Sequence, residues 1–273
     1  MTLSGVLNSP VVQAAEWTSS DLDLVCEQVL DCARIDRVLE PHRVIDDALV
    51  DRVLQIAGRC AAGEPLAYVL GWCDFDGLRL QVTPDVLIPR PDTETLVQAA
   101  LEVIGSRPVR LLDVCTGTGA VALSLKARRP EIEVVASDLS PKAIEVAQAN
   151  AAHLDLAVTC VVADGFEHAG IYDVICANPP YIAQHDSRVD PAVIQHEPEL
   201  ALFAGLDGLA VIRTLIQGGQ AHLTPGGWLL IEHGLDQREA VVELAEAQRW
   251  SHIQTLQDLA GRDRVTRLRK PYE

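Results

Sequence analysis

The sequence has few basic residues for its length. Twenty-two Lys and Arg stand against 39 Asp and Glu, which gives a formal net charge of −17 at pH 7. Binding to a phosphate backbone depends on Lys and Arg that displace counterions. This balance disfavours a nucleic-acid substrate, so we expect no direct nucleic-acid binding. An acidic net charge still permits a local basic patch.

Long apolar runs and paired cysteines are also missing. No apolar stretch of about eighteen residues occurs, and residues 1–17 lack a basic start followed by an apolar segment, so we expect no membrane span, no signal peptide and a cytoplasmic protein. The seven cysteines are odd in number and include no Cys-x-x-Cys pair. This usage indicates reduced thiols and predicts no metal site.

What is present predicts a large core and more than one structural part. With 273 residues, 48% of them hydrophobic, the chain can form one large domain with a smaller one beside it. Apolar residues recur at helical spacing around 22–30 and 48–57, and Asp76-Gly77 between alternating residues predicts a β-hairpin at about 72–82. We therefore expect a helical N-terminal domain at 1–71, a hairpin connector at 72–88 and a third part at 89–273.

Strands and helices alternate from Val109 onward. This pattern predicts an α/β domain with a mainly parallel, doubly wound sheet of seven strands covered on both faces. The predicted strands cover residues 109–114, 133–137, 157–162, 172–177, 228–232, 251–256 and 265–268, and the predicted helices 120–128, 141–152, 208–222 and 237–248.

Acidic residues end three successive predicted strands. Asp113 opens the segment Asp113-Val114-Cys115-Thr116-Gly117-Thr118-Gly119, whose glycines permit a tight turn before a helix with free N–H groups. Asp138 follows the second strand, where a carboxylate can accept hydrogen bonds from two ribose hydroxyls. Asp164 follows the third, in a position suited to an adenine amino group. Carboxyl ends of parallel strands share one edge of the sheet, so the three acids are expected to line one crevice.

Two cofactors compete for this crevice. Residues 117–122 satisfy the Gly-x-Gly-x-x-Ala pattern of dinucleotide binding, with Asp138 near the expected spacing. Asp113 favours the other candidate, because a carboxylate suits a cationic amino group and repels a pyrophosphate. S-Adenosylmethionine has such an amino group, an adenosine and no phosphate, and we predict it as the cofactor. A turn that binds nothing stays a third interpretation.

The tetrapeptide Asn178-Pro179-Pro180-Tyr181 follows the strand predicted at 172–177. Two prolines fix the backbone and remove two N–H donors, which leaves the carbonyls of Asn178 and Pro179 as rigid acceptors. Together with the Asn178 side-chain oxygen they can hold both hydrogens of a planar NH2 group while Tyr181 packs beside it. A Pro-rich turn after a strand is the alternative interpretation.

These motifs resemble those of a known family. The segment 113–119, Asp138 and residues 178–181 are similar to class I methyltransferases that modify planar nitrogens. The segments 64–71, 86–94, Glu197-Pro198 and 204–209 narrow the resemblance to the bacterial release-factor glutamine N5-methyltransferases, from about residue 60 to the C-terminus. The tetrapeptide alone does not separate this family from N6-adenine methyltransferases.

The resemblance implies an enzyme that transfers methyl from S-adenosylmethionine to the side-chain amide of the glutamine in the Gly-Gly-Gln loop of peptide chain release factors. It implies that residues 1–71 help to hold the release factor and that the cofactor contacts Asp113, Asp138, Asp164, Asn178 and the loop 115–119. It also places Asn178, Pro179, Pro180, Tyr181 and Glu197 toward the substrate, with Asn178, Pro179 and Tyr181 as the catalytic residues.

The chain departs from the family at two places. Cys115 stands where the loop usually begins with glycine, and Gly165-Phe166 follows Asp164 where relatives carry a bulky residue near the adenine. We expect Gly165 to line the adenine site and Phe166 to provide its packing. Two further interpretations stay open, namely an N6-adenine nucleic-acid methyltransferase and a non-catalytic protein that binds S-adenosylmethionine. The loop at Arg90 is a linker or a ligand-facing lip. Residues 182–203 are expected to form a loop that covers the substrate, and an ordinary surface excursion is the alternative.

Overall fold

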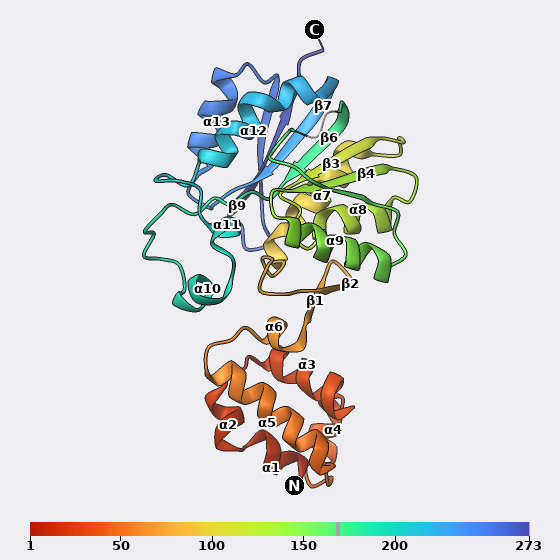
Figure 1. The fold of residues 1–273 in the computed structure, drawn as a ribbon, viewed down its shortest axis with the longest axis vertical. Helices are drawn as coiled ribbons and strands as arrows, with labels where there is room; N and C mark the ends of the chain where they lie inside the picture. Colours follow the sequence, from red (N-terminus) through yellow and green to blue (C-terminus); the bar gives the residue numbers. More distant parts are fainter. Residues whose placement is uncertain (168–169, 273) are drawn as a thin grey trace. The chain divides into compact units, whose positions relative to one another are not determined.

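A computed structural model describes residues 1–167 and 170–272 of the chain (Figure 1). The chain divides into two compact units, one of Met1–Gly71 with Pro191–His196 and one of Trp72–Asp190 with Glu197–Glu273. The hairpin that follows Gly71, which the sequence set apart as a connector, therefore groups with the second unit.

The first unit is helical. Its two longest helices, α3 and α5, match the two predicted from apolar spacing. A capping box between Thr18 and Asp21 begins α3, and the Asp46 carboxylate caps α5. Its elements are α1 (Leu3–Leu7), α2 (Pro10–Ala14), α3 (Ser19–Leu30), α4 (Arg34–Leu39), α5 (Asp47–Ala61), α6 (Leu66–Leu70) and α10 (Pro191–His196). The apolar sides of α1, α2, α3, α5 and α6 form one buried core that includes Leu3, Leu30 and Val53.

The second unit is built on a seven-stranded sheet. Its order is β5-β4-β3-β6-β7-β9-β8, with parallel pairing from β5 to β7 and antiparallel pairing of β9 with both of its neighbours. The strands are β3 (Arg110–Val114), β4 (Glu133–Asp138), β5 (Thr159–Val162), β6 (Tyr172–Ala177), β7 (Leu223–Glu232), β8 (His252–Gln257) and β9 (Asp263–Arg269). The separate hairpin pairs β1 (Trp72–Phe75) with β2 (Leu78–Gln81).

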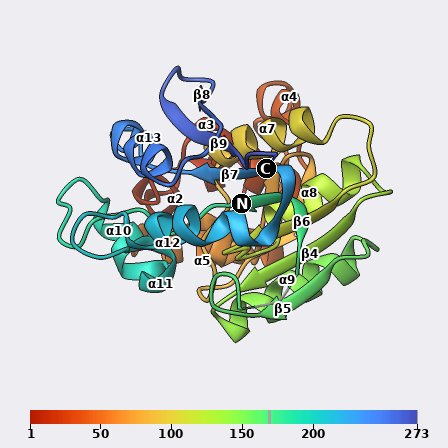
Figure 2. The same ribbon diagram turned by 90° about the horizontal axis from the view of Figure 1, so that it is seen from above.

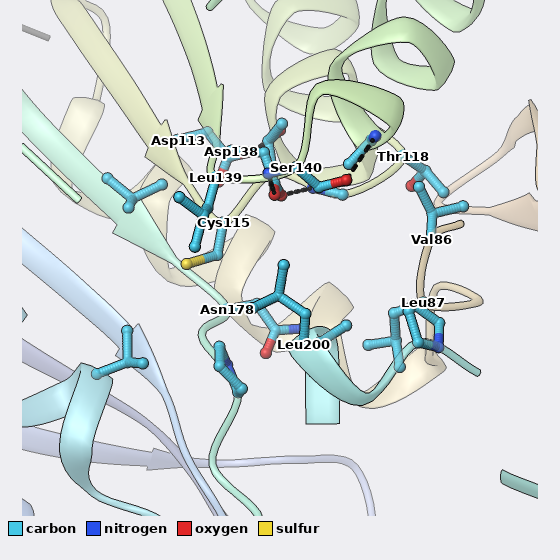
Figure 3. A pocket seen from close by; sticks show the side chains of 18 of the residues that line it. Val86, Leu87, Asp113, Cys115, Thr118, Asp138, Leu139, Ser140, Asn178 and Leu200 are labelled. Carbon is cyan, nitrogen blue, oxygen red and sulfur yellow. Dashed lines mark hydrogen bonds between the residues drawn. The ribbon is translucent and has the colours of Figure 1, made fainter. Parts of the chain in front are cut away.

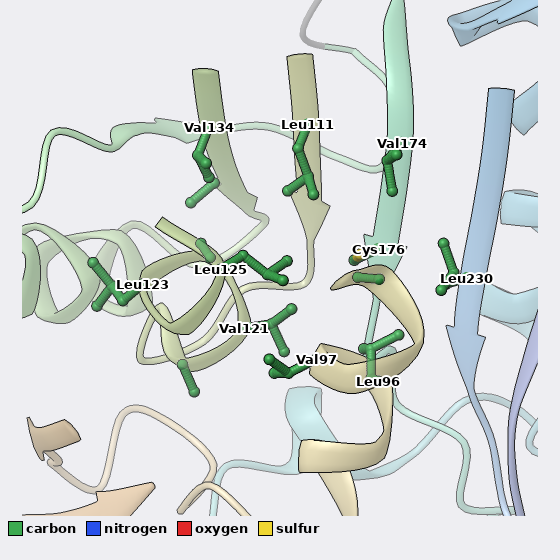
Figure 4. Packing of buried hydrophobic residues seen from close by; sticks show 14 of the residues in the cluster. Leu96, Val97, Leu111, Val121, Leu123, Leu125, Val134, Val174, Cys176 and Leu230 are labelled. Atoms are coloured by element: carbon green, nitrogen blue, oxygen red, sulfur yellow. The ribbon is translucent and has the colours of Figure 1, made fainter. Parts of the chain in front are cut away.

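Helices cover both faces of this sheet (Figure 2). Adjacent residues of β3 show the division, because Leu111 belongs to the core with α7 and α8, whereas Leu112 belongs to the core with α12 and α13. Figure 4 shows Leu111 and other strand residues against Leu96 and Val97 of α7 and Val121 of α8. The helices are η1 (Pro91–Thr93), α7 (Glu94–Ile104), α8 (Ala120–Arg128), α9 (Pro141–His153), α11 (Glu199–Leu202), α12 (Ala210–Gly218), η2 (Gly219–His222) and α13 (Arg238–Ala247).

The predicted α/β architecture with a mainly parallel, doubly wound sheet of seven strands is confirmed, with differences at the ends of elements. The helix predicted over 208–222 is α12 followed by a 3-10 turn, and β7 begins five residues earlier than predicted, at Leu223 instead of Trp228. Two short helices, α10 and α11, interrupt the segment that was expected to be a loop. No helix among the described residues is long and apolar enough to cross a membrane.

Candidate active site

A cavity of about 330 Å³ opens in the second unit beyond the carboxyl ends of β3, β4 and β6 (Figure 3). This is the edge where open parallel sheets bind ligands. Acidic side chains and the glycine loop lie across the cavity from Asn178 and Leu200. The predicted residues that line it are Asp113, Cys115, Thr116, Gly117, Thr118, Asp138, Asp164, Gly165, Asn178 and Pro180.

Asp113 is the most buried acid of the cavity, with 1% of its surface exposed. Its Oδ2 accepts hydrogen bonds from the Thr116 hydroxyl at 2.5 Å and the Ala122 N–H at 3.3 Å. Its Oδ1 has no partner among the residues that the structure describes. Burial raises the pKa of Asp113 to about 7, partly offset by these two bonds. A cation at Oδ1 would relieve this cost.

Asp138 is held by backbone donors on either side of it. Its Oδ2 accepts from the Gly117 N–H and its Oδ1 from the Ser140 N–H, both at 2.9 Å. Burial raises the pKa of Asp138, and the bonds from Ser140 and Gly117 oppose the rise. Asp138 thereby ties the glycine loop to the start of α9. Asp164 is exposed and lines the cavity beside Gly165.

The loop between β3 and α8 turns through three left-handed residues. Cys115, Gly117 and Gly119 have φ of 59°, 55° and 83°. A Cβ on Gly117 would meet nothing within 4 Å, whereas one on Gly119 would lie 3.0 Å from Leu123 Cδ1. Only Gly117 of the two faces open space, which permits close approach of a ligand to the backbone. Cys115 adopts this left-handed φ although it has a side chain. That side chain packs against the core that contains α12 and α13, and burial there raises the pKa of the thiol.

Asn150 is a buried residue of α9 that sequence reasoning missed. Its Oδ1 accepts from the Gln81 N–H at 2.6 Å, while its Nδ2 donates to the carbonyls of Gln81 at 3.1 Å and Thr118 at 2.9 Å. The side chain extends the hydrogen bonding of β2 and joins the hairpin to the glycine loop. An Asn inside an otherwise apolar helical pattern was the signal in the sequence.

Asn178 is oriented by a second residue that the sequence did not single out. Its Nδ2 donates to the Thr93 hydroxyl at 3.2 Å, and both side chains line the cavity. With the nitrogen engaged, the Asn178 Oδ1 is the atom left to accept from a ligand. Pro180 lines the cavity, whereas Pro179 is buried and Tyr181 stands outside the lining.

Tyr181 points its hydroxyl to Glu232, at the end of β7. The Tyr181 Oη donates to the Glu232 Oε1 at 3.3 Å. Burial raises the pKa of Glu232 to about 7, and it also raises the pKa of Tyr181, as does the Glu232 charge. The tyrosine therefore points toward Glu232 and packs against the core that contains α12 and α13, and it is not among the residues that line the cavity.

Two predicted site residues have partners that the sequence did not indicate. Phe166 does not line the cavity, because its ring stacks on His222 with centroids 4.7 Å apart. Glu197 does not present a free carboxylate to a substrate, because its buried side chain pairs with Arg90 and its Oε2 accepts from the Ile88 N–H at 3.2 Å. Glu197 instead joins the segment 86–90 to Pro198 and α11, and residues from both segments line the cavity.

The lining residues fit S-adenosylmethionine and oppose a dinucleotide. Asp113 offers a buried carboxylate oxygen without a partner in the described structure, Asp138 brings a second carboxylate to the lining, and Gly117 leaves room at the backbone. No Lys, Arg or His lines the cavity in the described part of the chain, so a pyrophosphate would meet carboxylates without compensation. The residues that would hold the cofactor are Asp113, Asp138, Asp164 and the loop 115–119.

Two family models match the chain. Residues 12–71 match the PrmC N-terminal domain, and residues 92–199 match the methyltransferase small domain. Solved structures share the fold at low identity. A methyltransferase from Pyrococcus furiosus aligns with a TM-score of 0.55 at 19% identity, over 71% of this chain and 90% of that one. A 16S rRNA methyltransferase from T. thermophilus aligns with a TM-score of 0.55 at 22% identity, over 73% and 49%.

Curated relatives match over nearly the whole length. The release factor glutamine methyltransferase of Bordetella pertussis is 43% identical over 78% of this chain and 80% of its own length. The enzyme of the same name from Neisseria gonorrhoeae is 39% identical over 89% and 90%, and that of Escherichia coli is 36% identical over 93% of both. With a matching fold, cofactor cavity and N-terminal domain, the chain belongs to the release factor glutamine methyltransferase family.

Proposed function

We propose that this protein transfers a methyl group from S-adenosylmethionine to the side-chain amide nitrogen, N5, of a glutamine in peptide chain release factors, the glutamine of their Gly-Gly-Gln loop. The names of the relatives supply the substrate class. The observation that carries the proposal is the orientation of Asn178, whose nitrogen is bound to Thr93 and whose oxygen is left for a donor. A primary amide is such a donor.

The chain's own groups would act by orientation. An amide nitrogen is a weak nucleophile because its lone pair is delocalised, so the enzyme has to fix its direction. The Asn178 Oδ1 and the Pro179 carbonyl would accept the two amide hydrogens, and the prolines keep these acceptors rigid. When bound, the cofactor would supply a methyl group on a positively charged sulfur, which would leave as a neutral thioether as the bond from carbon to N5 forms and one amide proton passes to solvent. Positioning of this kind lowers the activation free energy of the transfer by several kcal/mol.

The remaining expectations are part of the same proposal. We infer that residues 1–71 help to hold the release factor and that the protein acts in the cytoplasm, where release factors work. The acidic net charge of −17 supports a protein substrate over a nucleic acid.

Methyl-labelled S-adenosylmethionine tests the proposal with three acceptors. These are a bacterial release factor, the same factor with the glutamine of its Gly-Gly-Gln loop replaced, and duplex DNA. Label is expected in the first alone. Label in DNA, or equal label in both factors, would contradict the assignment. Asn178→Ala should abolish turnover and leave the Kd for S-adenosylmethionine within about threefold, whereas loss of both would place Asn178 in the cofactor site instead.

A further inference from the structure

The tetrapeptide contacts one buried carboxyl group, that of Glu232. Glu232 is 1% exposed and lies at the last position of β7, and Tyr181 donates to its Oε1 at 3.3 Å. Burial raises the pKa of this carboxyl and the Thr93 hydroxyl opposes the rise, while the Glu232 Oε2 has no hydrogen-bond partner among the described residues. An acceptor oxygen is thus available to Thr93.

The direction of the Thr93 hydroxyl decides which way the Asn178 amide faces. A threonine hydroxyl has one proton to donate and lone pairs to accept with. If Glu232 takes the proton, Thr93 can only accept from Asn178, which binds the NH2 end of the amide and turns the oxygen to the cavity. If Thr93 donated to Asn178 instead, the amide would be reversed. Its NH2 group would then face the NH2 group of a glutamine, and two donors repel.

We propose that Glu232 is a positioning residue, which through the Thr93 hydroxyl fixes the Asn178 amide with its oxygen toward the substrate and through the Tyr181 hydroxyl holds the aromatic ring in place. This inference rests on the proposed function, since it gives the amide clamp its orientation. Glu232 is not among the residues that line the cavity, and Thr93 is bound to Asn178. Both act through Asn178.

The ionisation of Glu232 is part of the mechanism. A carboxylate accepts from both hydroxyls, whereas a protonated carboxyl donates through one oxygen and so opposes one of them. Burial raises the pKa of Glu232 to about 7, and the Thr93 hydroxyl, Arg264 on β9, the Tyr181 hydroxyl and Asp92 on η1 are the groups that face it. Turnover should therefore fall as the pH drops through about 7, at saturating cofactor and substrate.

Glu232→Gln is the decisive variant, because it keeps the shape of the side chain. An amide has one oxygen and one NH2 group, so one of the two hydroxyls loses its acceptor and meets a donor. We expect kcat to fall on the order of 100-fold. The Kd for S-adenosylmethionine should stay within about threefold, and the acidic limb of the kcat profile near pH 7 should disappear. Thr93→Val should produce the same loss and Thr93→Ser should restore most of it.

Two further measurements separate positioning from a general structural role. Thr266→Val is the matched control, since Thr266 is a fully buried threonine that contacts His233 and Thr255 and does not line the cavity. It should lower stability and leave kcat within about threefold. The side-chain ¹⁵N resonance of Asn178, assigned by its loss in Asn178→Ala, should shift in Glu232→Gln and Thr93→Val and stay in place in Thr266→Val.

The outcomes distinguish a failure of the inference about Glu232 from a failure of the proposed function. A Glu232→Gln enzyme that is folded and binds the cofactor, with wild-type kcat or an unchanged pH profile, would overturn the inference while leaving the proposed function intact. A wild-type enzyme that labels no release factor would overturn the proposed function, and the ¹⁵N comparison would still decide whether Glu232 controls the Asn178 amide. If Thr93→Ser is as inactive as Thr93→Val, the hydroxyl is not the relay.

Discussion

The raised pKa of Asp113 predicts that cofactor binding depends on pH. Burial places this pKa at about 7, above the ordinary value of 3.8. A cationic ligand pairs with the ionised form, so binding must release the proton wherever the free protein still holds it. Affinity for S-adenosylmethionine should therefore fall about tenfold per pH unit below 7 and level off above it. Between pH 8 and pH 5 the expected loss is roughly 100-fold.

The same rise in the pKa of Asp113 predicts how the stability of the ligand-free protein depends on pH. As pH rises from 3.8 to 7, the unfolded carboxyl ionises while the folded one keeps its proton, so the free energy of unfolding decreases across this window by about 4 kcal/mol at most. Asp113→Asn removes the charge, and its amide oxygen can still accept from Thr116 and Ala122. We expect this variant to be more stable than the wild type at pH 8 and to bind the cofactor weakly at every pH.

Isothermal titration calorimetry from pH 5 to pH 8 measures the first effect, and denaturant unfolding without ligand measures the second. Asp164→Asn is the control, because Asp164 is exposed and lines the same cavity. It should reduce affinity by a similar factor at all pH values and retain the slope. An affinity that does not change between pH 5 and pH 8, or a slope that persists in Asp113→Asn, would refute the assignment of this carboxylate to the cofactor's cation.

Three smaller predictions concern the frame of the site. Asn150→Ala should lower the free energy of unfolding by about 2–4 kcal/mol, because it removes a fully buried side chain together with its hydrogen bonds to the Gln81 and Thr118 backbone, and denaturant unfolding measures it. Glu197→Ala should cost about 1–3 kcal/mol by the same assay and raise the KM for S-adenosylmethionine, since it frees the Ile88 N–H beside the cavity. Phe166→Leu should leave the calorimetric Kd for the cofactor within about twofold, because the ring stacks on His222; a tenfold loss would return Phe166 to the adenine site.

Local patterns predicted most of the sheet and the acidic side of the site. The strand ends that carry Asp113 and Asp138 were predicted within one residue, because alternating apolar strands and amphipathic helices leave a periodic signal. The parallel register then brings those ends to one edge without further information.

The contacts that orient the site left no such signal. Asn178 meets Thr93 across 85 positions of the chain, and Asn150 meets Gln81 across 69. Glu197 was expected to face a substrate, but Arg90 and the Ile88 N–H, more than a hundred positions away, take up its carboxylate. Periodicity reports which face of an element is buried. It does not report which distant polar partner a buried side chain finds.

The two sides of the site are neighbours because of strand order. β3 pairs with β4 on one side and β6 on the other, and the register sets Val114 opposite Ala177. Asp113 and Asn178 therefore lie at the ends of adjacent strands, which are spaced by about 4.8 Å. This closeness constrains the chemistry of each side. Carboxylates suit the cation, but a carboxylate at position 178 would itself be a nucleophile beside the methyl donor. A neutral amide and backbone carbonyls can hold an NH2 group without competing for the methyl, provided that a buried network such as the one at Glu232 keeps the amide oxygen turned toward the substrate.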